Sequence, residues 1–184
     1  MALVTLKVPY EAAMMLEGVE VPGERLSASD MHVMLLYMGK GTPLVEVARA
    51  MLACHEVARA FSPFLLLLNR VGAFPEGEDG TPIILPVMSP VVMSLQASLK
   101  LAFQKYGMEF SDKFPDFKPH VTLSYLQAGE NVPPLAGLPG PLSWVAHEMM
   151  IWGGDAGESD VSIRVPFVLS PVHKAAARLT ERLG

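Results

Sequence analysis

The sequence of 184 residues contains one cysteine, Cys54, and no long run of apolar residues. A single cysteine excludes an intramolecular disulfide and a metal site built from several thiolates. The unbroken apolar stretch 64–68 is far shorter than the roughly 20 residues that cross a bilayer. Polar residues and a proline at 7–11 interrupt any secretory signal. We therefore expect no membrane partner and a cytoplasmic location.

An excess of positive charge is also missing, since the formal net charge is −5. Such a surface repels long polyanions, so we expect no long nucleic acid as a partner. A nucleotide ligand would be small, or at most a short oligonucleotide. Hydrophobic residues make up 51% of the chain, which is enough to bury one core. We expect a single domain, 1–184, made of two lobes.

The expected elements mix strands and helices, which favours the α+β class. Strands are predicted at 2–8, 32–38, 64–71, 81–88, 120–126, 142–152 and 161–169. Helices are predicted at 11–17, 43–61, 90–106 and 175–183, with Thr42 and Ser89 as N-caps. Loops are predicted at 21–30, 75–80 and 133–141. Each half of this order contains one strand that begins with histidine.

One heptapeptide occurs twice. His-Val-Met-Leu-Leu-Tyr-Met at 32–38 returns as His-Val-Thr-Leu-Ser-Tyr-Leu at 120–126. The two copies agree at the first, second, fourth and sixth positions. A chain that carries one strand twice is expected to carry one site twice, with a histidine from each lobe facing a central cleft.

Alternation along a strand places His120, Thr122 and Ser124 on one face, and Tyr125 on the other as a packing residue. In the first copy, Met34 and Leu36 share the face of His32, and Tyr37 points away. Histidine can move a proton near neutral pH, and a hydroxyl can donate to an anionic oxygen. Two facing histidines thus predict general acid and base catalysis on a phosphate, without a metal.

These residues resemble the 2H phosphoesterase superfamily, also called LigT-like or 2′,5′-RNA ligase-like, whose signature is two H-x-[ST]-x motifs. His120-Val-Thr-Leu matches in full, after Phe117-Lys118-Pro119. His32-Val-Met-Leu matches the first motif with its hydroxyl residue replaced by Met34. The loop from Val21 resembles members from phages and actinobacteria, which would place the protein in the host cytoplasm if a phage encodes it. The resemblance covers about residues 2–170.

The resemblance implies a bilobal α+β fold in which two antiparallel sheets face a central cleft, with helices outside. It implies chemistry on a 2′,3′-cyclic phosphate, a 2′,5′-linked oligonucleotide or a related nucleotide, with no cofactor and no metal. The implied catalytic residues are His32 and His120. The implied substrate-binding positions are Thr122, Met34, Ser124 and Lys118.

Met34 leaves two interpretations open, because a thioether cannot donate a hydrogen bond to a phosphoryl oxygen. Losing one such donor can lower a rate by about 10²-fold. The protein is then either a phosphodiesterase with reduced activity, or a catalytically weakened nucleotide-binding or phage-associated accessory protein. The other candidates favour ordinary structural roles: His55, His147 and His173 as structural or exposed residues, and Phe74, Trp144 and Trp152 as core packing rather than base stacking.

Overall fold

The computed structural model describes residues 2–68, 70–111, 116–135, 137–138, 140–153 and 161–168. Its strands are β1 (Ala2–Lys7), β2 (Glu24–Arg25), β3 (His32–Gly39), β4 (Phe64–Leu68), β5 (Gly72–Ala73), β6 (Thr81–Met88), β7 (His120–Leu126), β8 (Leu142–Ala146), β9 (Glu148–Gly153) and β10 (Val161–Pro166). Its helices are α1 (Tyr10–Glu17), α2 (Leu44–Ala58) and α3 (Pro90–Lys105). The helix predicted at 175–183 lies outside the described residues.

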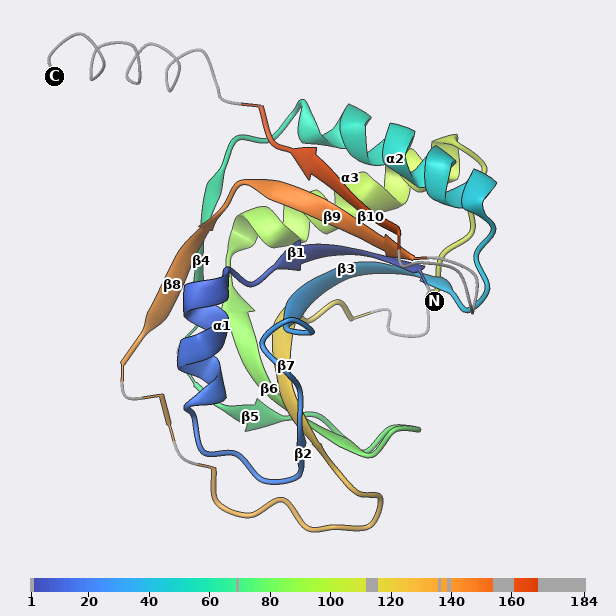
Figure 1. Cartoon of the computed structure of the whole chain (residues 1–184). Coiled ribbons are helices and arrows are strands. Elements are labelled where there is room, and N and C mark those ends of the chain that lie inside the picture. The colour runs from blue at the N-terminus through green and yellow to red at the C-terminus, as the bar shows by residue number, and fades with distance from the viewer. Residues whose placement is uncertain are drawn as a thin grey trace, which may run out of the picture.

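The strands form one curled antiparallel sheet in the order β10-β9-β1-β3-β7-β6-β4-β8, with β2 added to β7 and β5 to β6 (Figure 1). The α+β class is confirmed. The two expected sheets are the two halves of this path, and they meet where β3 pairs with β7 through Val33 opposite Val121. The two histidine strands are therefore direct neighbours at the centre of the sheet.

One face of the central strands is buried in the core. Val33 and Val121 are fully buried, and α2 and α3 supply apolar side chains to the same cluster. These two helices lie against each other, with α2 along β9 and β10, whereas α1 lies beside β8 (Figure 1). Cys54 in α2 is fully buried in this core, and burial raises the pKa of its thiol to about 12.

The predicted N-cap of α2 is wrong. The Thr42 hydroxyl donates backward to the carbonyls of Met38 and Gly39 at 3.5 and 3.3 Å, and Pro43 is the N-cap. Helix α3 does begin at Pro90, where the missing N–H costs nothing, but the Ser89 side chain makes no capping hydrogen bond.

The strand predicted at 142–152 is two strands, which break at the exposed His147. The reason is that β8 pairs with β4 in one half of the sheet, whereas β9 pairs with β1 in the other half. The segment 64–71 is shorter than predicted, and β4 is not a fully buried central strand, because Leu65 and Leu67 are exposed. Among the described residues, no helix has the length and apolar character needed to cross a membrane.

Matching β-bulges interrupt both histidine strands. In β3, Met34 pairs with Thr5 and Leu36 with Val4, so Leu35 is the extra residue. In β7, the extra residue is Leu123, because Thr122 pairs with Ile84 and Ser124 with Ile83. An inserted residue reverses the alternation of the side chains that follow it, up to the next irregularity. Beyond each bulge, the residues expected on the histidine face turn toward the core.

Glycines permit two loops to approach the end of β7. Gly80 has φ +101°, and a Cβ there would overlap the Leu126 carbonyl oxygen. Gly23 has φ +85°, and a Cβ there would overlap the Tyr125 carbonyl oxygen. Only glycine combines this backbone conformation with so close an approach.

We expect Gly80→Ala to destabilise the protein more than Gly39→Ala does. Gly39 has a similar φ of +110°, but no atom lies within 4 Å of the position that a Cβ would take, so its substitution measures backbone strain alone. The added clash at Gly80 should cost about 1–3 kcal/mol more in the free energy of unfolding. Urea denaturation measures both values, and equal losses would contradict the close approach.

Candidate active site

The two histidines begin β3 and β7 and are held in the same way. His32 Nδ1 lies 2.6 Å from the Asp30 carbonyl oxygen, and His120 Nδ1 lies 2.7 Å from that of Lys118. A carbonyl oxygen only accepts, so each Nδ1 carries the hydrogen and donates it. The backbone thus selects one tautomer in both rings and leaves both Nε2 atoms available for proton transfer.

An aromatic ring packs against each imidazole. Trp152 lies edge-on to His32, with ring centroids 5.0 Å apart and planes at 66°. Phe74 lies edge-on to His120, with 4.6 Å between centroids and 79° between planes. Together with the Nδ1 hydrogen bond, each contact restricts the rotation of its imidazole. Trp144, in contrast, is buried away from the histidines in β8.

A cavity of about 120 Å³ lies between the two histidine strands. Its lining consists of Leu26, Asp30, His32, Met34, His120, Thr122 and Tyr125. The structure therefore brings together four positions that the sequence predicts for the site, two from each copy of the heptapeptide. A cavity of this size can hold a group such as a phosphate.

The strand register makes the two sides of this cavity unequal. Because Val33 lies opposite Val121 in an antiparallel pair, His32 faces Thr122 across the strands, and Met34 faces His120. The hydroxyl is therefore beside His32 and the thioether beside His120. Thr5 is the neighbour of Met34 on β1, but it is fully buried and its hydroxyl points to the Met150 carbonyl oxygen at 3.5 Å.

The expected position of Ser124 on the histidine face is wrong. The bulge at Leu123 turns Ser124 inward, where it is fully buried and its Oγ donates to the Pro22 carbonyl oxygen at 2.6 Å. The same reversal brings Tyr125, predicted as a packing residue, into the cavity lining. No signal in a single sequence marks such a bulge, since it depends on the register of the partner strand.

The Lys118 side chain is exposed and is not among the lining residues of the cavity. Lys118 contributes to the site through its backbone carbonyl, which accepts the hydrogen bond that orients His120. A contact between its ammonium group and a phosphate stays a prediction.

Two charged residues near the site were not predicted. Asp30 lines the cavity, and its carboxylate accepts a hydrogen bond from Ser27 Oγ at 2.7 Å. Lys7 pairs with His32 across β1 and β3, so both side chains share one face of the sheet. The Lys7 side chain is exposed and is not among the lining residues of the cavity.

Burial lowers the pKa of both His32 and His120 below the ordinary value of 6.5. At His32, the hydrogen bond to the Asp30 carbonyl and the charge of Asp30 partly offset this effect. At His120, the hydrogen bond to Lys118 opposes burial, but the charge of His32 lowers the pKa further. Of these charges, that of Asp30 favours the proton on His32.

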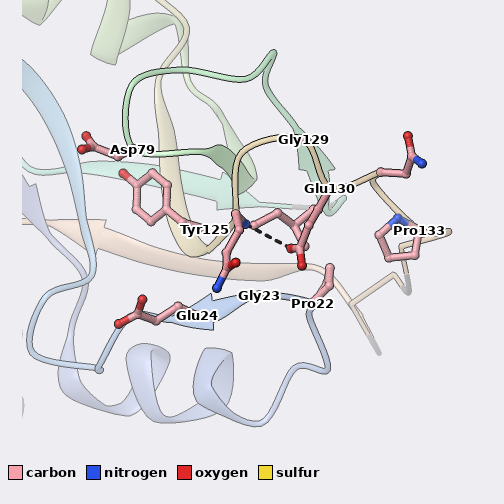
Figure 2. A pocket seen from close by; sticks show the side chains of 11 residues that line it. Pro22, Gly23, Glu24, Asp79, Tyr125, Gly129, Glu130 and Pro133 are labelled. Atoms are coloured by element: carbon pink, nitrogen blue, oxygen red, sulfur yellow. Dashed lines mark hydrogen bonds between the residues drawn. The ribbon is translucent and has the colours of Figure 1, made fainter.

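A larger cavity of about 720 Å³ adjoins the small one at Tyr125, which lines both. Figure 2 shows that the Tyr125 ring lies between the carboxylates of Asp79 and Glu24. Across this cavity, Glu130 accepts a hydrogen bond from the backbone N–H of Gln127 at 3.1 Å. The described lining of this larger cavity is therefore acidic.

A family model described as the 2′-5′ RNA ligase superfamily matches residues 22–157, a span that includes both histidine motifs. The chain belongs to this superfamily. No curated protein matches it. Membership supports a function of the 2H phosphoesterase or ligase type, and it confirms the resemblance stated from the two motifs.

Solved structures of low sequence identity share the fold of this superfamily member. The Thermus thermophilus protein TT0787 is 20% identical with a TM-score of 0.69, over 89% of this chain and 94% of the other. Escherichia coli LigT, solved as a complex with 3′-AMP, is 17% identical with a TM-score of 0.66, over 92% of this chain and 97% of LigT. A structure described as a phosphoesterase is 20% identical with a TM-score of 0.63, over 91% of this chain and 94% of the other.

We expect both site histidines to titrate below pH 6.5 in the folded protein, because burial disfavours the imidazolium. As the pH falls, the unfolded chain binds protons at these two histidines before the folded protein does. The stability that the two histidines contribute is therefore complete above pH 6.5 and is lost as the pH falls through their folded pKa values. NMR titration of the imidazole signals, assigned with His32→Asn and His120→Asn, measures the midpoints. A midpoint at or above 6.5 would contradict the buried environment.

Proposed function

We propose that the protein is a metal-independent phosphoesterase that acts on a 2′,3′-cyclic, 2′,5′-linked or related small nucleotide. The observation that carries this proposal is the pair of imidazoles, each fixed through Nδ1 and each bordering one phosphate-sized cavity. Such a pair supplies the base and the acid that phosphodiester cleavage requires. Superfamily membership supports the same class of reaction.

In the proposed reaction, neutral His120 takes a proton from water through Nε2 as the water oxygen forms a bond to phosphorus. The bond from phosphorus to the leaving ribose oxygen breaks, and His32 gives its Nε2 proton to that oxygen. The charge of Asp30 supports this assignment, because it favours the charged form of His32. Repulsion between the two rings disfavours a second proton on the other histidine.

Thr122 and Lys7 complete the proposed site on the side of His32. The Thr122 hydroxyl would donate to a phosphoryl oxygen whose negative charge grows in the transition state. Lys7, on the neighbouring strand, would attract the anionic substrate toward the cavity. The corresponding support beside His120 is absent, because Met34 has no donor.

We expect His120→Asn and His32→Asn each to lower kcat on adenosine 2′,3′-cyclic phosphate by about 10²–10⁴-fold, the usual contribution of a positioned acid or base. His55→Asn is the matched control, since His55 is an exposed residue of α2 outside the cavity. Hydrolysis is followed by chromatography of the product. Wild-type rates in either site variant would refute the proposed mechanism.

The alternative function is nucleotide binding on a 2H scaffold whose catalysis is weak. The observation in its favour is the position of Met34, directly across from His120. A phosphate would then bind between the histidines without the second hydroxyl contact, and bond breaking would be slow.

We expect Met34→Thr to raise kcat by up to about 10²-fold, because it adds a donor beside His120. Met34→Leu is the control, since it keeps an apolar side chain of similar size. Nucleotide binding to the wild type is measured in parallel by thermal shift. An inactive wild type that binds nucleotide and becomes active only as Met34→Thr would favour the binding function instead.

A further inference from the structure

The larger cavity is where the rest of a substrate would lie if its phosphate occupied the small one. The two linings share Tyr125, and about 720 Å³ lies within the range of ligand pockets. A ligand that reached from the small cavity into the larger one would lie along Tyr125.

The backbone fixes the position of Glu24 and Asp79 beside Tyr125. Glu24 pairs with Tyr125 across β2 and β7, so the two side chains share one face. Asp79 belongs to the turn that Gly80 holds against the end of β7. Figure 2 shows the two carboxylates on opposite sides of the tyrosine ring. A ligand that extended along Tyr125 into the larger cavity would therefore lie near two exposed carboxylates.

No opposite charge balances them within the described lining, which contains Glu130 but no lysine or arginine. Among the described residues, neither Glu24 nor Asp79 has a hydrogen-bond or ion-pair partner. The amides of Gln127 and Asn131 supply donors and acceptors on the same lining. This combination can bind a base or sugar hydroxyls, and it repels a phosphate.

We propose, on the basis of the function proposed above, that this cavity receives the uncharged nucleoside part of the substrate and that Glu24 and Asp79 exclude a second phosphate. The preferred substrates then carry a single phosphate group, at the bond to be cleaved. Nucleotides with a further phosphate, including longer oligonucleotides that extend along Tyr125, are selected against by like-charge repulsion.

The test compares adenosine 2′,3′-cyclic phosphate with the same compound carrying a 5′-phosphate. The wild type is expected to prefer the singly phosphorylated compound in kcat/KM by about tenfold or more at low salt. The preference should decrease with added salt, because the Debye length falls from about 30 Å at 0.01 M to about 8 Å at 0.15 M.

The double variant Glu24→Gln/Asp79→Asn is expected to reduce the preference to about twofold or less, mainly by accelerating turnover of the doubly phosphorylated compound. The control is Glu11→Gln/Glu109→Gln, which changes the net charge equally at two exposed positions outside both cavities. This control should keep the wild-type preference, and circular dichroism verifies that both double variants are folded.

Equal turnover of the two compounds by the wild type, or a preference that the Glu24 and Asp79 substitutions leave unchanged, would overturn the inference. A wild type that hydrolyses neither compound contradicts the proposed phosphoesterase activity instead. In that case, thermal shift with the same two compounds decides the inference separately. Stronger binding of the singly phosphorylated compound, lost in the Glu24→Gln/Asp79→Asn protein, would support it, and equal binding would overturn it.

Discussion

The pairing of β3 with β7 is the interaction on which the rest of the site depends. Val33 and Val121 lie opposite each other, fully buried, and join the two halves of the sheet. A slip of one residue would turn one imidazole toward the helices and one valine toward the cavity. The apolar face of these strands therefore fixes the relative position of the two histidines, because burial of the valines allows only one register.

The duplication is more complete in backbone geometry than in side-chain chemistry. Each half repeats a bulge, a histidine bonded to a carbonyl two residues earlier and an aromatic ring edge-on to that histidine. The charges and hydroxyls are not repeated. Thr122 faces His32 across the strands and the charge of Asp30 acts on it, whereas His120 faces Met34. A symmetric scaffold thus holds two histidines in different environments, which is what separate acid and base roles require.

The sequence predicts local features well and partner-dependent features poorly. The bounds of β6 and β7 and the identity of both histidine strands follow from apolar patterning and turn residues. Tyr125 lines the cavity in place of the predicted Ser124 because of a β-bulge, and the position of a bulge depends on the neighbouring strand. The break at His147 depends likewise on two partner strands in different halves of the sheet. Two-residue strands such as β2 are too short to show the alternation of apolar and polar residues that predicts a strand. Yet β2 places Glu24 beside Tyr125.

The charge that meets a phosphate in the small cavity has to come largely from the histidines themselves. Its described lining contains no lysine or arginine, and Asp30 adds a negative charge. Burial lowers both imidazole pKa values, so the unliganded site favours neutral rings. A bound phosphate favours the imidazolium instead, because an opposite charge nearby stabilises the charged form. In the proposed reaction, substrate binding and protonation of one histidine would therefore be coupled, and the charge of Asp30 would direct that proton to His32, beside the hydroxyl of Thr122.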